Sequence, residues 1–125
     1  MNKSIRIGGA SGFWGDSYRA TEQLIQDTTL DFIVYDYLAE ITMSIMARAR
    51  AKSPSAGYAT DFIDAVIKPY IKRISKHNTR LISNAGGVNP EKCAEVISEL
   101  VKDLQLNLKV SCITGDDLSL IHISE

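Results

Sequence analysis

Acidic side chains follow several of the expected strands of this 125-residue chain, at positions where they could transfer a proton or bind a cation. They are Asp16, Asp36, Glu40, Asp116 and Asp117. A carboxylate beside a substrate hydroxyl can act as a general acid or base, and several carboxylates together suit a hard cation such as Mg²⁺. We take all five as candidate catalytic residues and assign no metal. Roles as helix caps or solvated turns stay open for them.

Small, polar and aromatic residues accompany these acids and could contact a substrate. Glycines let backbone N–H groups approach an anion, and asparagine amides could donate to a carbonyl or phosphate oxygen. The aromatic pair Phe13 and Trp14 could form an apolar wall for a prenyl-like chain or pack under neighbouring loops. The candidate substrate-binding residues are Gly9, Ser11, Gly12, Phe13, Trp14, Gly15, Ser17, Tyr37, Asn84, Gly86, Gly87 and Asn89.

The elements that must position these residues alternate between strands and helices. Apolar runs with turn residues after them predict strands over residues 4–8, 31–35, 80–83 and 106–113. Helical spacing and capping residues predict helices from Asp16 or Ser17 to about residue 27, over 38–52, over 60–76 with a bend at Pro69, and from Pro90 with Asn89 as cap. In the second helix the apolar stripe consists of Leu38, Ile41, Ile45, Met46 and Ala49.

This alternation predicts an α/β protein with a parallel sheet and crossover helices, in a Rossmann-like three-layer arrangement. The carboxyl ends of parallel strands lie at one edge of the sheet, where such folds bind ligands. Residues 8–17, 36–40, 84–89 and 115–117 should therefore share that edge.

Composition and charge limit the partners of the chain. An apolar fraction of 45% argues against disorder, and a net charge of −1 disfavours a nucleic acid or a membrane surface as partner. The two cysteines have no metal-ligand spacing, and the chain has neither a signal-peptide pattern nor an apolar run long enough to span a membrane. We expect a cytoplasmic protein that acts on a small molecule.

The glycine-rich segment allows more than one interpretation. A Walker A alignment fails because Asp16 stands where the phosphate-binding lysine belongs. Gly9, Gly12 and Gly15, followed by Asp36 about 20 residues later, resemble a dinucleotide fingerprint, and Asn84-Ala85-Gly86 resembles an element of the short-chain dehydrogenases. However, the chain has no Y-x-x-x-K pair. An NAD(P)-binding oxidoreductase domain is thus an alternative function, a structural turn is another reading, and no cofactor is assigned.

Five blocks in order give a wider resemblance: RIGGASGFWGDS, VYDYLAE, GYATDFI, ISNAGGVNP and GDDL. Together they resemble the N-terminal domain of the acyclic terpene utilisation family. The resemblance implies a bacterial catabolic protein, an enzyme or enzyme component, that degrades citronellol- and geraniol-type terpenes or related branched compounds through acyl-CoA intermediates. It implies no particular reaction, and its substrate would be a terpenoid acyl-CoA. A non-catalytic subunit is a further alternative.

The resemblance also sets expectations for the ends of the chain. Family members are longer, so residues 1–118 would form the N-terminal part of the domain, and residues 119–125 resemble a non-native tail. A parallel sheet that stops at its fourth strand exposes an unpaired edge and apolar surface. We therefore expect an incomplete fold that self-associates, with a homo-oligomer as one outcome.

Overall fold

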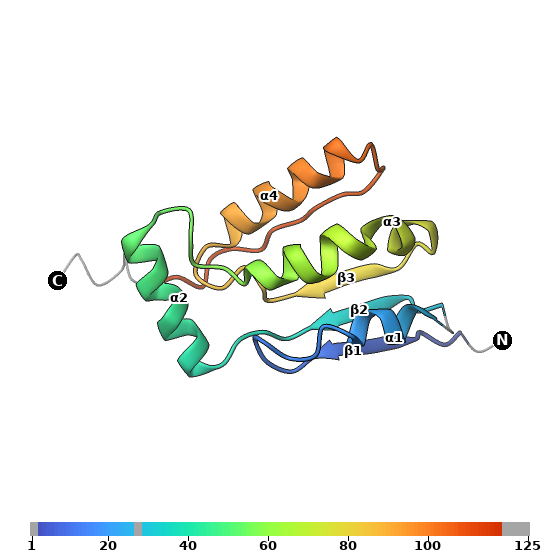
Figure 1. Cartoon of the computed structure of the whole chain (residues 1–125), viewed down its shortest axis with the longest axis horizontal. Coiled ribbons are helices and arrows are strands. Elements are labelled where there is room, and N and C mark those ends of the chain that lie inside the picture. The colour runs from blue at the N-terminus through green and yellow to red at the C-terminus, as the bar shows by residue number, and fades with distance from the viewer. Residues whose placement is uncertain (1–2, 27–28, 119–125) are drawn as a thin grey trace.

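The architecture is given by a computed structural model that describes residues 3–26 and 29–118 (Figure 1). The elements in chain order are β1 (Ile7–Ser11), α1 (Ala20–Gln26), β2 (Phe32–Tyr35), α2 (Glu40–Lys52), the π-helix η1 (Phe62–Ile67), α3 (Lys68–Lys76), β3 (Arg80–Ser83) and α4 (Pro90–Asp103). The strands form one parallel sheet in the order β1-β2-β3, which confirms the predicted α/β class with crossover helices.

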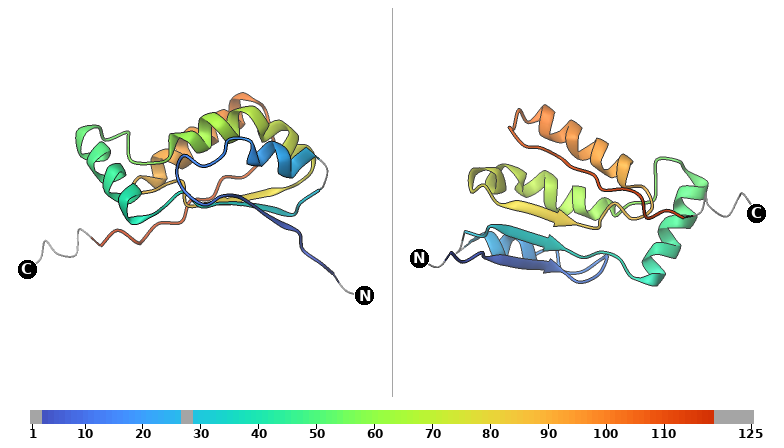
Figure 2. Two further views of the ribbon diagram at one scale, coloured as in Figure 1. Left: turned by 60° about the horizontal axis from the view of Figure 1, so that its bottom comes forward. Right: turned by 180° about the vertical axis from the view of Figure 1, so that it is seen from behind.

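Of the helices that connect the strands, α1 and α3 lie on one face of the sheet, as the left view of Figure 2 shows. Successive strands are added in one direction, and crossovers of one hand then place their helices on the same side. Ile33 and Tyr35 of β2 point into this helical layer and are buried. On the opposite face Ile7 and Ile82 are 64% and 53% exposed, so within the described residues the helices cover a single face.

The first strand lies three residues later than predicted. β1 pairs with β2 from Ile7 to Ser11, so the first two glycines belong to the strand rather than to a turn. At Gly8 a Cβ would lie 2.7 Å from Cδ1 of Leu30, which explains glycine in the strand. The turn is shifted along the chain to residues 12–19, and α1 begins at Ala20 rather than at Asp16 or Ser17.

The predicted fourth strand over residues 106–113 is wrong. In Figure 1 the chain after α4 runs back alongside β3 and in the direction of the strands, but the described residues form three strands only. Leu106 and Leu108 still pack against the core, so the alternating pattern of burial is present without a hydrogen-bond ladder. The alternation of apolar and polar residues from which the strand was predicted reflects side-chain packing. Such packing does not require backbone hydrogen bonds to a neighbouring strand.

Two further elements differ in detail from the prediction. On α2 the buried residues are Thr42 and Met46. Met46 belongs to the predicted stripe, but Ile41 is 72% and Ile45 47% exposed, so only part of the stripe lies on the packed face. The third predicted helix is present, but its first part is the π-helix η1. Pro69 follows at the start of α3, where its ring and missing N–H disturb regular α-helical bonding to the preceding turn.

A close crossing of three segments holds α2 against the rest of the molecule. Gly87 has a φ of 55°, and a Cβ there would lie 2.7 Å from the carbonyl oxygen of Gly57 and would also overlap Sδ of Met46. The N–H of Val88 donates to the same Gly57 oxygen at 2.9 Å. The backbone at residue 87 therefore approaches its neighbours to a distance that excludes a side chain.

The structure tests the prediction about membrane-spanning segments but not the prediction about the tail. None of the helices in the described parts of the chain combines the length and apolar character that crossing a membrane requires. Residues 119–125, which we separated as a non-native tail, lie outside the described residues, so that assignment stays a prediction.

The crossing at Gly87 gives a stability test. Gly87→Ala should lower the free energy of unfolding by about 2 kcal/mol, because it adds a left-handed backbone penalty to steric overlap. Gly9→Ala is the matched control: a Cβ there meets nothing within 4 Å, and the expected change is within about 0.5 kcal/mol. Urea unfolding of both variants measures the difference, and equal stabilities would contradict the close approach.

Candidate functional site

Three strand ends are tied together at the carboxyl edge of the sheet. Oδ1 of Asn84 accepts the N–H of Tyr37 at 2.8 Å, and Nδ2 of Asn84 donates to Oδ1 of Asp36 at 2.8 Å. The carbonyl of Tyr37 accepts the N–H of Trp14 at 3.1 Å. We call these four residues the strand-end relay. It confirms that segments 8–17, 36–40 and 84–89 share one edge.

The glycine turn is closed by its own carboxylate. Oδ2 of Asp16 accepts the N–H of Gly12 at 2.9 Å, and Oδ1 accepts the N–H of Ser17 at 2.7 Å. These two backbone hydrogen bonds hold the pKa of Asp16 below its ordinary value. A phosphate approaching the turn would find these donors occupied and a negative charge in place. The turn therefore does not offer the anion site that a dinucleotide needs.

Sheet order also speaks against the dinucleotide interpretation. In the dinucleotide-binding fold the chain returns after the third strand to lie beside the first, and the ligand binds at that reversal. Here the segment after α4 lies alongside β3 (Figure 1), and β1 is an edge strand among the described residues. Gly9 thus lies in a strand, and Gly12 and Gly15 lie in the turn after it. The sheet lacks the strand order that a dinucleotide site at this turn would require.

The other candidate acids do not converge with Asp16. Asp36 accepts the N–H of Leu38 at 3.2 Å besides its bond to Asn84, and Glu40 lies exposed in the first turn of α2. Asp116 and Asp117 are exposed in the segment after α4, which is not a strand. An oxygen of Asp117 lies 3.9 Å from the Arg50 guanidinium. Among residues 3–26 and 29–118, no three His, Cys, Asp or Glu side chains could hold a metal ion together. A shared cation site of the five acids is therefore wrong.

Residues 85–89 support a neighbouring loop rather than offer donors to a ligand. Asn89 is 6% exposed, and its Nδ2 donates to the carbonyls of Pro54 and Ala56 at 3.0 and 2.9 Å. Asn89 is the N-cap residue of α4, as predicted, but its side chain makes no capping bond to the helix. At Gly86 a Cβ would lie 2.7 Å from that of Pro90, and Gly87 contacts the same loop as Asn89. Together they fix the position of residues 54–59.

An aromatic cluster lies beneath the strand-end relay. The rings of Tyr35 and Tyr37 stack with centroids 6.3 Å apart, and both meet Phe62 of η1 edge to face, at 5.2 and 5.9 Å. The Tyr35 hydroxyl and Oγ1 of Thr21 lie 2.8 Å apart. Burial raises the pKa of Tyr35 to about 12 and also raises the pKa of Tyr37. Both phenols are therefore neutral hydrogen-bonding groups near neutral pH.

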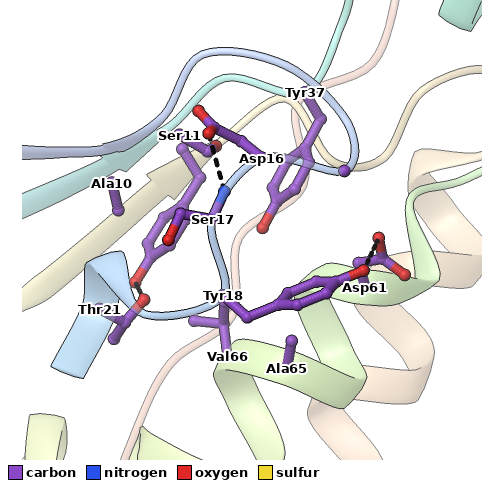
Figure 3. A pocket seen from close by; sticks show the side chains of 12 residues that line it. Ala10, Ser11, Asp16, Ser17, Tyr18, Thr21, Tyr37, Asp61, Ala65 and Val66 are labelled. Atoms are coloured by element: carbon purple, nitrogen blue, oxygen red, sulfur yellow. Dashed lines mark hydrogen bonds between the residues drawn. The ribbon is translucent and has the colours of Figure 1, made fainter.

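Two cavities border this cluster, and we name them the tyrosine pocket and the tryptophan hollow. The tyrosine pocket has a volume of about 20 Å³, and its lining includes Ser11, Ser17, Tyr18, Tyr37 and Asp61 (Figure 3). The tryptophan hollow has about 260 Å³, and its lining includes Trp14, Met46, Ala49, Ala56 and Tyr58. The tyrosine pocket is small and has a mixed polar and apolar lining, whereas the tryptophan hollow is larger and mostly apolar.

The structure places some of the predicted substrate-binding residues in the lining of the two cavities and the others outside them. Ser11, Gly15, Ser17 and Tyr37 line the tyrosine pocket together with Asp16, and Trp14 lines the tryptophan hollow. Phe13 is 55% exposed and lines neither cavity. Gly9 is exposed within β1, and the remaining predicted residues support the fold as described above.

Sequence reasoning missed Tyr18, Met46, Tyr58 and Asp61 in the lining of these cavities. Tyr18 donates its hydroxyl to Oδ2 of Asp61 at 3.2 Å across 43 positions of sequence. One signal was available: Tyr58 and Asp61 both belong to the block GYATDFI, which was singled out as a distinctive stretch. The block contains four cavity residues, Gly57, Tyr58, Thr60 and Asp61, and none of them follows a strand.

Comparison with known proteins gives one match. The sequence model described as "Acyclic terpene utilisation family protein AtuA" matches residues 5–123, a range that includes every segment of both cavities. A search of curated proteins and a search of solved structures found no match.

The strand-end relay predicts a stability effect for Asn84. Asn84→Ala removes two hydrogen bonds between strand ends and should lower the free energy of unfolding by about 1 kcal/mol. Asn107→Ala, at an exposed position after α4, is the matched control and should change it by less than about 0.5 kcal/mol. Chemical denaturation of the two variants measures the difference. Equal values would mean that the relay does not hold the strand ends.

Closure of the glycine turn by Asp16 predicts a pH dependence. Because these hydrogen bonds hold the folded-state pKa of Asp16 below its ordinary value, the ionised carboxylate stabilises the fold above that ordinary value, and this contribution is lost as the pH falls through the folded pKa. Asp16→Asn should therefore be less stable than wild type near neutral pH, and the difference should shrink below pH 3.8. Unfolding curves of both proteins across this range test it. A difference that stays constant into strong acid would contradict the role of the charge.

Proposed function

Since the chain belongs to the acyclic terpene utilisation family, we propose that it binds an acyclic terpenoid of the citronellol or geraniol type in the tryptophan hollow. Family membership gives the general role, which is acyclic terpene utilisation. The observation that supports the specific proposal is an apolar cavity of about 260 Å³ with the indole of Trp14 in its lining. The cavity is slightly smaller than the range of roughly 300–1,000 Å³ that is typical for small-molecule sites.

The lining of the hollow suits a flexible branched hydrocarbon. Met46 of α2 is an adaptable apolar side chain, and the rings of Trp14 and Tyr58 offer flat apolar surfaces. Ala49 and Ala56 leave room between them, because neither side chain extends beyond Cβ. Burial of the ligand's apolar surface would contribute about 25 cal/mol per Å². An acyclic terpenoid has such a surface along most of its length and a polar group at one end.

We further propose that the ligand is carried as an acyl-CoA during degradation in the bacterial cytoplasm. Support comes from the last turns of α2, where Arg48 and Lys52 are exposed beside Ala49 of the hollow. Cations at this place could bind the phosphates of coenzyme A. The proposal concerns binding, and both catalysis by this chain and a non-catalytic role as a subunit stay predictions. The NAD(P) alternative is not proposed, because Asp16 occupies donors of the glycine turn.

Fluorescence of Trp14 gives a direct test, because it is the sole tryptophan of the chain. Titration with citronellol should produce a saturable change in its emission. Ala49→Leu should fill the hollow and weaken binding by about tenfold or more, which is about 1.4 kcal/mol. Ala47→Leu is the matched control, because Ala47 is exposed on the same helix and does not line the hollow.

Two results would contradict the proposal. One is an emission that shows no saturable response in a protein whose circular dichroism shows it to be folded. The other is an equal loss of affinity in Ala47→Leu and Ala49→Leu, which would mean that the ligand binds elsewhere or that the substitutions act through stability.

A further inference from the structure

The tyrosine pocket adjoins the tryptophan hollow at two places in the chain. Trp14 lines the hollow and the next residue, Gly15, lines the pocket. Thr60 lines the hollow and the next residue, Asp61, lines the pocket. Because consecutive residues border the two cavities at both places, the two linings lie next to each other in the fold.

The pocket presents an acceptor and donors from three separate elements. Asp61 immediately precedes η1, Tyr18 comes from the turn before α1, and Tyr37 follows β2. In Figure 3 the Tyr37 hydroxyl points toward the Tyr18 side chain, whose own hydroxyl donates to Asp61. The bond from Tyr18 to Asp61 is long at 3.2 Å, and Tyr18 is 60% exposed, so this contact can open at little cost.

The size of the pocket limits what it can hold. Its volume of about 20 Å³ exceeds the roughly 10–15 Å³ that a single water-sized group requires. A hydroxyl group fits that space, whereas a phosphate or a ring does not. The pocket is therefore sized for one polar group at the end of a ligand and not for a second molecule.

The chemistry of the lining decides among such groups. The carboxylate of Asp61 accepts a hydrogen bond, and the neutral phenol of Tyr37 can donate one. A hydroxyl group can form both hydrogen bonds, because it can donate one and accept one. An aldehyde oxygen only accepts, and a carboxylate would be repelled by Asp61.

We propose that the tyrosine pocket is a subsite for the hydroxyl group of an acyclic alcohol, in which Asp61 accepts the hydroxyl proton and Tyr37 donates to the hydroxyl oxygen. Tyr18 holds Asp61 in place when the pocket is empty and covers it from solvent. This inference rests on the proposed function, because the hollow must hold the apolar part of the same ligand. It adds a preference for an uncharged alcohol over the corresponding acid, and it concerns the free terpenoid and not its acyl-CoA form, whose thioester carries no hydroxyl group.

The test compares three ligands that share one carbon skeleton: citronellol, the hydrocarbon without the hydroxyl group, and citronellic acid as its carboxylate. Trp14 emission reports binding of each. Citronellol should bind most tightly and the carboxylate most weakly. Asp61→Asn should weaken citronellol about tenfold, leave the hydrocarbon unchanged and improve binding of the carboxylate. Tyr37→Phe keeps the stacked ring and should weaken citronellol alone.

Asp64→Asn is the matched control. Asp64 is exposed, pairs with Lys68 at 3.0 Å and lies three positions after Asp61 in the chain. It should leave all three affinities unchanged. If Asp61→Asn and Tyr37→Phe leave citronellol unaffected while the hydrocarbon still binds, the subsite is wrong and the proposed function stands. If they weaken the hydrocarbon as much as the alcohol, their role is structural and the subsite is wrong. If none of the three ligands binds the folded protein, the proposed function fails and the subsite fails with it.

Discussion

The side chain of Asn84 ties the ends of neighbouring strands together just beyond the sheet. It accepts from the N–H of Tyr37 and donates to Asp36, and the Tyr37 carbonyl then accepts from Trp14. A single residue, Tyr37, thus has its backbone fixed on both sides while its side chain enters the aromatic cluster. The positions of both cavities depend on this relay, because Tyr37 lines one and Trp14 the other.

A second constraint is the carboxylate of Asp16, which decides what the glycine turn can bind. Glycine turns at the ends of strands often present N–H groups to phosphate. Here the donors of Gly12 and Ser17 are used internally, so the turn is a rigid support for Trp14 instead. The same sequence pattern is therefore compatible with the proposed apolar ligand site, because one acid takes the place of the anion that the turn would otherwise attract.

Features that depend on interactions between residues close in the sequence could be predicted from the sequence, whereas features that depend on distant residues could not. The third strand at Arg80–Ser83 and the common edge of three segments were predicted correctly, since both follow from local pattern and parallel topology. The fourth strand and the exposure of Ile41 and Ile45 on α2 were not, because a ladder and the packing of a helix depend on distant partners such as Gly87. The partnership of Tyr18 with Asp61 spans 43 positions and has no local signature.

The central claim is that the relay orients two cavities toward opposite ends of one ligand. Intermolecular nuclear Overhauser effects from bound citronellol test this most directly. The account predicts contacts from the branched end of citronellol to Trp14 and Met46, and from its hydroxyl-bearing carbon to the ring protons of Tyr37. Contacts with the exposed sheet face at Ile7 and Ile82, or the reverse orientation in the cavities, would contradict it.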